Sequence, residues 1–185
     1  MAGEIQLNSV SFASESSGTI TVNNGTIGTS VVFPSGHVIQ TVRSTKSGSS
    51  STTTSTTFAK VQNSSSETFG ATINNVAANS KILIQTNFVS NFSKSSNNAG
   101  GQYGLYREAT IILGESTLSN PGSYYQHTGV TDTLYYVPQF IMFLDESPGT
   151  GTNNYFLGYA AHSGTSVGVL GHIPTFEMIL MEIAE

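Results

Sequence analysis

Residues 47–61, SGSSSTTTSTTFAKV, begin with eleven residues whose side chains are all a hydroxyl group or a hydrogen atom. Such a run is compatible with a linker, a mucin-like tract or the polar rim of a β-structure. Apolar strand patterns resume on both sides of it, and it contains no proline, which a mucin-like tract is expected to have. Thr favours strands, whereas Ser and Gly favour loops. The stretch therefore predicts a loop at 47–51, followed by a strand with a hydroxyl-covered face that runs to Val61.

The composition indicates one globular domain with few charges. The chain has 185 residues, of which 37% are hydrophobic and only 9% are charged, against roughly 25% charged residues in an average soluble domain. The net charge is −5, and the six Lys and Arg residues are scattered singly. Nucleic acids bind clustered cations, so we expect no nucleic-acid partner. The chain has no Cys, which excludes disulfides and thiolate chemistry within it.

The N-terminal residues MAGEIQLNSV have neither a cationic start nor an apolar core of the kind that signal peptides carry. Apolar runs also stay short of the ~18 residues that a membrane-spanning helix needs. We therefore expect a protein made in a cytoplasm, without membrane insertion.

Short alternating apolar runs, separated by Gly, Asn and Ser clusters, fill residues 36–185 and favour strands. Ile82, Ile84 and Phe88 are expected core positions, and Pro138 predicts a bulge or a sheet edge. The segment 175–185, TFEMILMEIAE, fits a helix or a strand, and its alternation favours the strand. The expected fold is all-β, an antiparallel β-sandwich or a jelly-roll-like domain.

Residues 1–35 are expected to form a separate N-terminal attachment arm. Ile5, Leu7 and Val10 follow an alternating pattern, and Asn24-Gly25 is a strong hairpin signal. Large apolar side chains are scarce in this segment, and two or three short strands are not stable alone in water. The arm is therefore expected to lie against the main domain, against its own copies or against another protein.

Several phrases in residues 36–185 together resemble a family of small tail-fibre and virion structural proteins of tailed bacteriophages, of the marine and cyanobacterial type. The phrases are GHVIQTVRSTKSGSSSTTTSTTFAKV (36–61), ANSKILIQTNF (78–88), YGLYREATIILG (103–114), FLDESPGTGTNNYFLGYAAHSG (143–164) and FEMILMEIAE (176–185). Members of that family similarly show Q-x-V-x-x-T-K, a Ser/Thr run closing on T-T-F, S-K-I-L-[IV], R-[DE] and a terminal M-E-I. The resemblance implies a virion component with a trimeric β-sandwich head, and it implies no catalytic residues.

No constellation of residues predicts catalysis or a metal site. Asp145-Glu146 is the sole adjacent acidic pair, and neighbours at a strand end point to opposite faces, so we expect a solvated strand end there. The four histidines, His37, His127, His162 and His172, lack the spacing of metal ligands. No G-x-S-x-G motif marks a nucleophilic serine. We expect no enzymatic activity and no cofactor.

Aromatic residues supply the candidate ligand site. Tyr124, Tyr125 and His127 lie in NPGSYYQHTG, a predicted loop, where tyrosines can stack on sugar rings. Packing under their own loop, or at a subunit contact, is the favoured alternative for these three. A second group of aromatic residues is expected in the core: Tyr135, Tyr136, Phe140 and Phe143.

Two classes of function remain. The first is a fibre-type virion component that contributes to attachment to a host surface glycan or protein. The alternative is a purely structural head fibre, capsid decoration or tail adaptor, and a cellular lectin-like domain ranks third. Strands that are apolar on both faces predict self-association. The expected assembly is a homotrimer that joins other virion proteins through its N-terminal arm, and the threefold symmetry rests on the resemblance alone.

Overall fold

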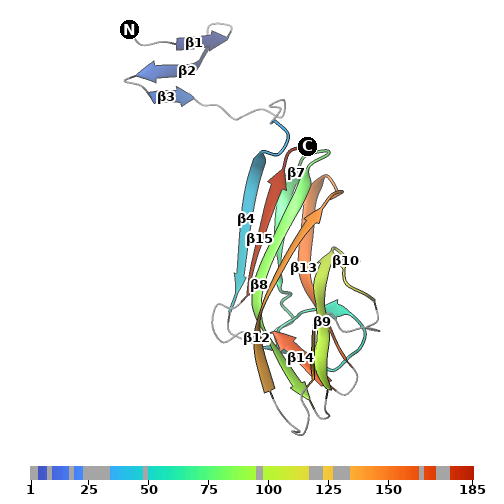
Figure 1. Ribbon diagram of the computed structural model, residues 1–185. Helices are drawn as coiled ribbons and strands as arrows, with labels where there is room; N and C mark the ends of the chain where they lie inside the picture. The colour runs from blue at the N-terminus through green and yellow to red at the C-terminus, as the bar shows by residue number, and fades with distance from the viewer. Residues whose placement is uncertain are drawn as a thin grey trace. The chain divides into compact units, whose positions relative to one another are not determined.

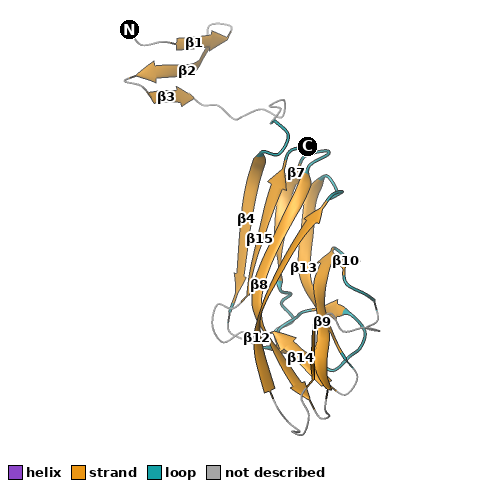
Figure 2. Ribbon diagram, in the orientation of Figure 1, coloured by secondary structure: helices purple, strands orange, loops and turns teal. Residues whose placement is uncertain are grey.

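The computed structural model describes residues 4–7, 10–16, 19–22, 34–47, 50–94, 98–116, 123–126, 134–162, 165–169 and 176–185. All regular elements in these ranges are strands, so the all-β prediction is confirmed (Figure 2). In the same ranges, no helix long and apolar enough to cross a membrane is found. The chain divides into two compact units, Met1–Phe33 and Pro34–Glu185.

The N-terminal unit is a three-stranded antiparallel sheet in the order β1-β2-β3 (Figure 1). Its strands are β1 (Glu4–Leu7), β2 (Val10–Ser16) and β3 (Thr19–Val22). Ile5 pairs with Ala13 and Ala13 with Val22. The expected Asn24-Gly25 hairpin lies outside the described residues.

The second unit is a sandwich of two antiparallel sheets. The first sheet is built around β8 (Lys81–Lys94), which pairs with β12 (Leu134–Asp145) on one side. On its other side, β8 pairs first with β15 (Phe176–Ile183) and then with β14 (Thr165–Val169). Beyond these lie β4 (Val38–Lys46), next to β15, and β5 (Ser51–Thr53), next to β14. This sheet is therefore four strands wide opposite residues 82–87 of β8 and again opposite residues 90–92.

The second sheet has the order β10-β9-β13-β6, with β11 paired to β9 and β7 paired to β13. Its strands are β6 (Ala59–Lys60), β7 (Gly70–Val76), β9 (Asn98–Arg107), β10 (Thr110–Leu113), β11 (Ser123–Gln126) and β13 (Gly151–Ala161). Figure 1 draws β7 and β13 behind β4, β15 and β8.

The core lies between the two sheets, and alternation selects the residues that reach it. Ile82, Ile84 and Phe88 are buried as predicted. The segment 176–183 is a strand, as its alternation indicated. Its inner face consists of Phe176, Met178, Leu180 and Glu182, and its outer face of Glu177, Ile179, Met181 and Ile183.

The hydroxyl-rich stretch crosses from the first sheet to the second. It forms β5 and β6, which pair with β14 and β13, so the prediction of one continuous strand to Val61 is wrong. Hydrogen bonds to side chains interrupt the strand between β5 and β6. Thr53 Oγ1 accepts from the Ser55 amide at 3.1 Å, and Ser55 Oγ accepts from the Thr57 amide at 3.0 Å. Such local bonds compete with a strand ladder. The crossing ends at buried Phe58.

Pro138 lies in an edge strand. Of the two predicted alternatives, a bulge or a sheet edge, the edge is therefore the one observed. Among the described strands, β12 pairs only with β8. The register runs without a shift from Leu134 opposite Ser93 to Asp145 opposite Ile82. A bulge at Pro138 is therefore excluded, and the edge explains how a residue without an amide hydrogen fits there.

Candidate functional site

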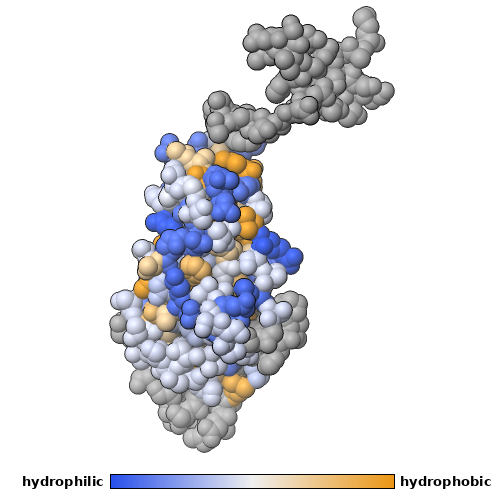
Figure 3. All heavy atoms as spheres, turned by 180° about the vertical axis from the view of Figure 1, so that it is seen from behind, coloured by the Kyte–Doolittle hydropathy of each residue, from blue (hydrophilic) through white to orange (hydrophobic). Residues whose placement is uncertain are grey.

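The outer face of the first sheet carries exposed apolar side chains. We define the apolar outer face as Leu134, Tyr136, Phe140 and Met142 of β12, Leu83 and Val89 of β8, and Ile179 and Met181 of β15. The four β12 residues are 44%, 56%, 63% and 61% exposed, in that order, and the other four are partly buried. Figure 3 views the opposite side, where hydrophilic and neutral residues dominate and apolar residues form small separate groups.

The prediction that Tyr136 and Phe140 belong to the core is wrong. Side chains on a strand alternate between the two faces, so the even-numbered residues of β12 point away from the sandwich. Val137, Ile141 and Phe143 occupy the inner face and pack against the core. The prediction therefore holds for Phe143, while the side chain of Tyr135 lies outside the described residues.

A small hollow of about 100 Å³ lies on this outer face, between β8, β12 and β15. Its lining residues are Gln85, Thr86, Asn87, Phe140, Glu177 and Ile179. The Glu177 carboxylate beside it pairs with Arg43 of β4. The hollow is thus lined by two apolar side chains, Phe140 and Ile179, and by polar side chains, of which Glu177 is in an ion pair.

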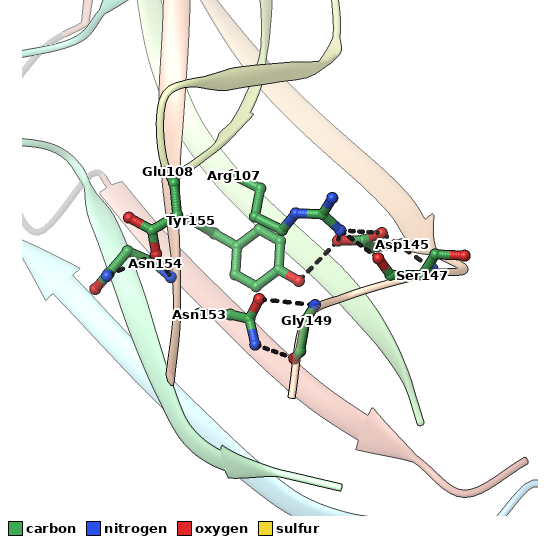
Figure 4. Close-up of polar contacts among 8 residues, drawn as sticks. All are labelled: Arg107, Glu108, Asp145, Ser147, Gly149, Asn153, Asn154 and Tyr155. Atoms are coloured by element: carbon green, nitrogen blue, oxygen red, sulfur yellow. Dashed lines mark hydrogen bonds and ion pairs between the residues drawn. The ribbon is translucent and has the colours of Figure 1, made fainter. Parts of the chain in front are cut away.

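A polar cluster around buried Asp145 and Tyr155 holds the end of the sandwich where β12 turns into β13 (Figure 4). Arg107 Nη1 donates to both Asp145 carboxylate oxygens, at 3.0 and 2.7 Å, and to the Ser147 carbonyl at 2.6 Å. Tyr155 Oη donates to Asp145 Oδ2 at 2.8 Å. Asp145 is buried, so the expectation of a solvated strand end is wrong for it. Its neighbour Glu146 is exposed and pairs with Lys81 at 2.7 Å.

Two further contacts hold the adjoining turns. The Asn153 side chain accepts from the Gly149 amide at 3.2 Å and donates to the Gly149 carbonyl at 2.6 Å. Glu108 Oε1 accepts from the Asn154 amide and from its Nδ2, both at 2.8 Å. Two of the phrases that carry the bacteriophage resemblance, 103–114 and 143–164, therefore meet in this cluster.

Hydrogen bonds to Asp145 hold this cluster together. Its Oδ1 accepts from Arg107, and its Oδ2 accepts from Arg107 and from Tyr155. Burial, together with the hydrogen bond to Asp145, raises the pKa of the Tyr155 phenol well above its ordinary value. Tyr155 therefore stays protonated and serves as a donor to the carboxylate.

Glu182 is a buried carboxylate that sequence reasoning missed. It lies on the inner face of β15, where its Oε1 accepts from the Ala77 amide at 2.8 Å. Its Oε2 accepts from Gln40 Nε2 at 2.6 Å, and Gln40 also donates to the Asn74 carbonyl at 2.8 Å. The sequence pattern could have revealed this burial, because Glu182 continues the alternating series of Phe176, Met178 and Leu180 on the inner face.

The hydroxyl-rich stretch lines a shallow depression of about 400 Å³. The lining residues are Ser50, Ser51, Thr52, Thr53, Ala59, Lys60, Gln62, Asn63, Ser64 and Tyr159. Several of their polar groups already bond within the chain: Ser51 Oγ lies 2.8 Å from Tyr159 Oη, and Asn63 Nδ2 donates to Glu67 at 2.8 Å. Lys60 Nζ lies 4.1 Å from the centre of the Phe156 ring. The contacts of Ser51 and Lys60 join β5 and β6 to side chains of β13.

The predicted ligand residues are only partly described. Tyr124 and Tyr125 lie in β11, paired with Gly100 and Ala99 of β9, so the predicted loop is wrong at these positions. Their side chains and the whole of His127 lie outside the described residues, as does His172. The other two histidines lie at opposite ends of the sandwich: His37 precedes β4, and His162 follows β13. The ligand assignment to Tyr124, Tyr125 and His127 stays a prediction.

No protein-family model matches the chain, and no curated protein sequence matches it.

Proposed function

We propose that this chain is a structural protein of a tailed-bacteriophage virion, a fibre-type component that contributes to attachment to the host surface. The observation that carries the proposal is the apolar outer face. Four large apolar side chains are exposed on this face. Only 9% of the residues are charged, so electrostatic repulsion does little to prevent copies of the chain from associating through it. Such a surface is suited to permanent assembly.

The division into two units also supports this function. The small N-terminal sheet has few residues with which to build a core of its own, and the sandwich has an extensive one. In a fibre, the small N-terminal sheet matches the attachment arm, and the sandwich matches the head that faces the receptor. We propose that the arm joins other virion proteins, that the chain is a homotrimer and that a host glycan or protein is its receptor.

Immunogold labelling of purified particles tests the proposal. An antibody against the sandwich unit is expected to decorate the tail tip in electron micrographs. Labelling spread over the capsid lattice supports the alternative, a head fibre or decoration protein, and labelling at the head–tail junction supports an adaptor. Particles that lack the chain altogether refute all three.

A second experiment tests the arm. Without residues 1–35, the sandwich is expected to fold and to self-associate but not to join particles assembled in its presence. Mass spectrometry of the purified particles measures its incorporation, with the full-length chain as the control. Incorporation of the truncated chain at the full-length level contradicts the role given to the arm.

A further inference from the structure

We infer that the apolar outer face is the surface through which copies of this chain associate, with Phe140 of one copy entering the hollow beside Ile179 of the next. The inference rests on the proposed function in one respect, because it takes self-association as its premise. It goes further by assigning the interface, its anchor residue and the site that receives the anchor.

The first support is where exposure is concentrated. Five large apolar side chains are exposed in the described part of the chain, and four of them lie at even positions of β12, from Leu134 to Met142. On the same face, Val89 and Leu83 of β8 and Ile179 and Met181 of β15 are only partly buried. Apolar positions therefore run across three adjacent strands, whereas isolated exposed residues need no explanation.

The second support is that the face, and not the free edge, is open to a partner. β12 has an unpaired edge among the described strands, and such an edge can recruit another strand. Pro138 lies near the middle of β12 and has no amide hydrogen to offer. A proline there opposes strand addition along the edge, so the side chains of the face remain as the contact.

The third support is charge, which favours a second copy as the occupant. On this side of the sheet, Arg43 pairs with Glu177, and Lys81 with Glu146. β12 itself carries no charged residue until Asp145, which is buried. A face whose charges are already paired can meet a copy of itself without repulsion. It offers nothing to a strongly charged partner such as a nucleic acid or an anionic membrane.

The fourth support is size and shape. The twelve residues of β12 extend over about 40 Å, and the three strands of the apolar outer face span about 14 Å, which gives a face of roughly 580 Å². Two such faces together amount to roughly 1,150 Å², and a biological interface is expected to bury at least about 1,000 Å² in total, so this face is of the required size. Phe140 projects beside the hollow that it helps to line. A protruding aromatic residue and an adjacent hollow form a complementary pair between copies, as interface anchors do.

The test compares wild-type protein with Phe140→Glu, and with Thr110→Glu as the matched control. Thr110 is exposed on β10 of the second sheet. Multi-angle light scattering at micromolar concentration is expected to show an oligomer for wild type and T110E, and a monomer for F140E with an unchanged circular dichroism spectrum. A monomeric wild type, or an F140E protein that remains oligomeric, overturns the inference.

A second measurement keeps the test decisive if F140E does not fold. The chain has no cysteine, so Met142→Cys and Thr110→Cys each introduce a single thiol. In the assembled protein, M142C is expected to react with a thiol reagent about tenfold more slowly than T110C, because only the dissociated fraction exposes it. Equal reaction rates overturn the assignment of this face.

The outcomes separate this inference from the proposed function. If the chain associates through the apolar outer face but is absent from virus particles, the interface assignment holds and the virion role is refuted. If the chain is found in particles but its F140E variant still self-associates, the virion role stands and the interface assignment fails.

Discussion

Glu182 is a fully buried carboxylate whose hydrogen bonds constrain the sandwich. Its two carboxylate oxygens each accept one hydrogen bond, from Ala77 and from Gln40, in a site without solvent exposure. Glu182→Gln replaces one acceptor with a donor that faces another donor. We expect the free energy of unfolding to fall by about 1–3 kcal/mol, the cost of an unsatisfied buried group.

Urea unfolding followed by circular dichroism measures this effect. Glu177→Gln, on the outer face of the same strand, is the matched control and is expected to cost less than about 1 kcal/mol. Equal costs for the two variants contradict the role assigned to Glu182.

Tyr155 gives the sandwich a predictable alkaline limit. Burial raises the pKa of its phenol, and the hydrogen bond to Asp145 adds to the rise. Below about pH 10, both folded and unfolded chains keep this proton. Above it, the unfolded chain loses the proton and the folded chain retains it. Stability therefore falls as pH rises, by up to about 1.4 kcal/mol per pH unit for this group.

Urea unfolding between pH 9 and 11 tests this prediction. Tyr155→Phe has no proton to lose, so its stability is expected to fall less steeply with pH than that of the wild type. The variant starts from lower stability because Asp145 loses a donor, but that loss does not change the slope. Parallel pH profiles contradict the prediction.

At the scale of elements, the crossing between β5 and β6 depends on Phe58. Its ring is buried and stacks on Tyr106 at 5.3 Å between ring centres, and its carbonyl accepts from the Tyr106 hydroxyl at 2.9 Å. Phe58→Ala is expected to reduce the free energy of unfolding by about 3–5 kcal/mol, because a buried aromatic side chain leaves a cavity. Thr54→Ala, an exposed change in the same crossing, is expected to stay within about 0.5 kcal/mol. Thermal unfolding of both variants distinguishes an anchored crossing from a passive loop.

Alternation and turn chemistry were sufficient to predict most strands of the sandwich. They predicted β8 with its inner Ile82 and Ile84, and they favoured the strand over the helix for β15. Alternation could not tell which apolar face of β12 is covered, because that depends on which strands pack over it. The pairing of Arg107 with buried Asp145 was also beyond reach, since the two residues are 38 positions apart in the sequence.

The hydroxyl-rich stretch shows a different limit of prediction. Thr propensity correctly indicated strand at Thr52 and Thr53, whereas Ser51, predicted as loop, already belongs to that strand. The hydrogen bonds that Thr53 and Ser55 make to nearby backbone amides end the strand. The same side chain favours a ladder in one backbone conformation and a local turn in another. Tyr124 and Tyr125 show the converse, because pairing with β9 makes a strand of a segment rich in turn residues.

At the scale of the whole molecule, the two units are expected to be independent in stability. The sandwich unit, Pro34–Glu185, contains its own core. Removal of residues 1–33 is therefore expected to shift the melting temperature of the sandwich by less than about 3 °C. Differential scanning calorimetry of the truncated and full-length chains measures the shift. A fall of 10 °C or more contradicts this independence.

The edge position of β4 has a mechanical consequence. β4 begins at Val38 beside Ile183, and the Gly36 amide and the His37 carbonyl each bond to Ala184 at 2.8 Å. Tension between the two chain ends loads these hydrogen bonds one at a time, so β4 peels from β15 at low force. When the sandwich is instead gripped at its far end, near Lys46 and Phe176, tension from the N-terminus runs along β4 and loads the whole ladder in shear. The same strand is thus a weak tether in the first geometry and a strong one in the second.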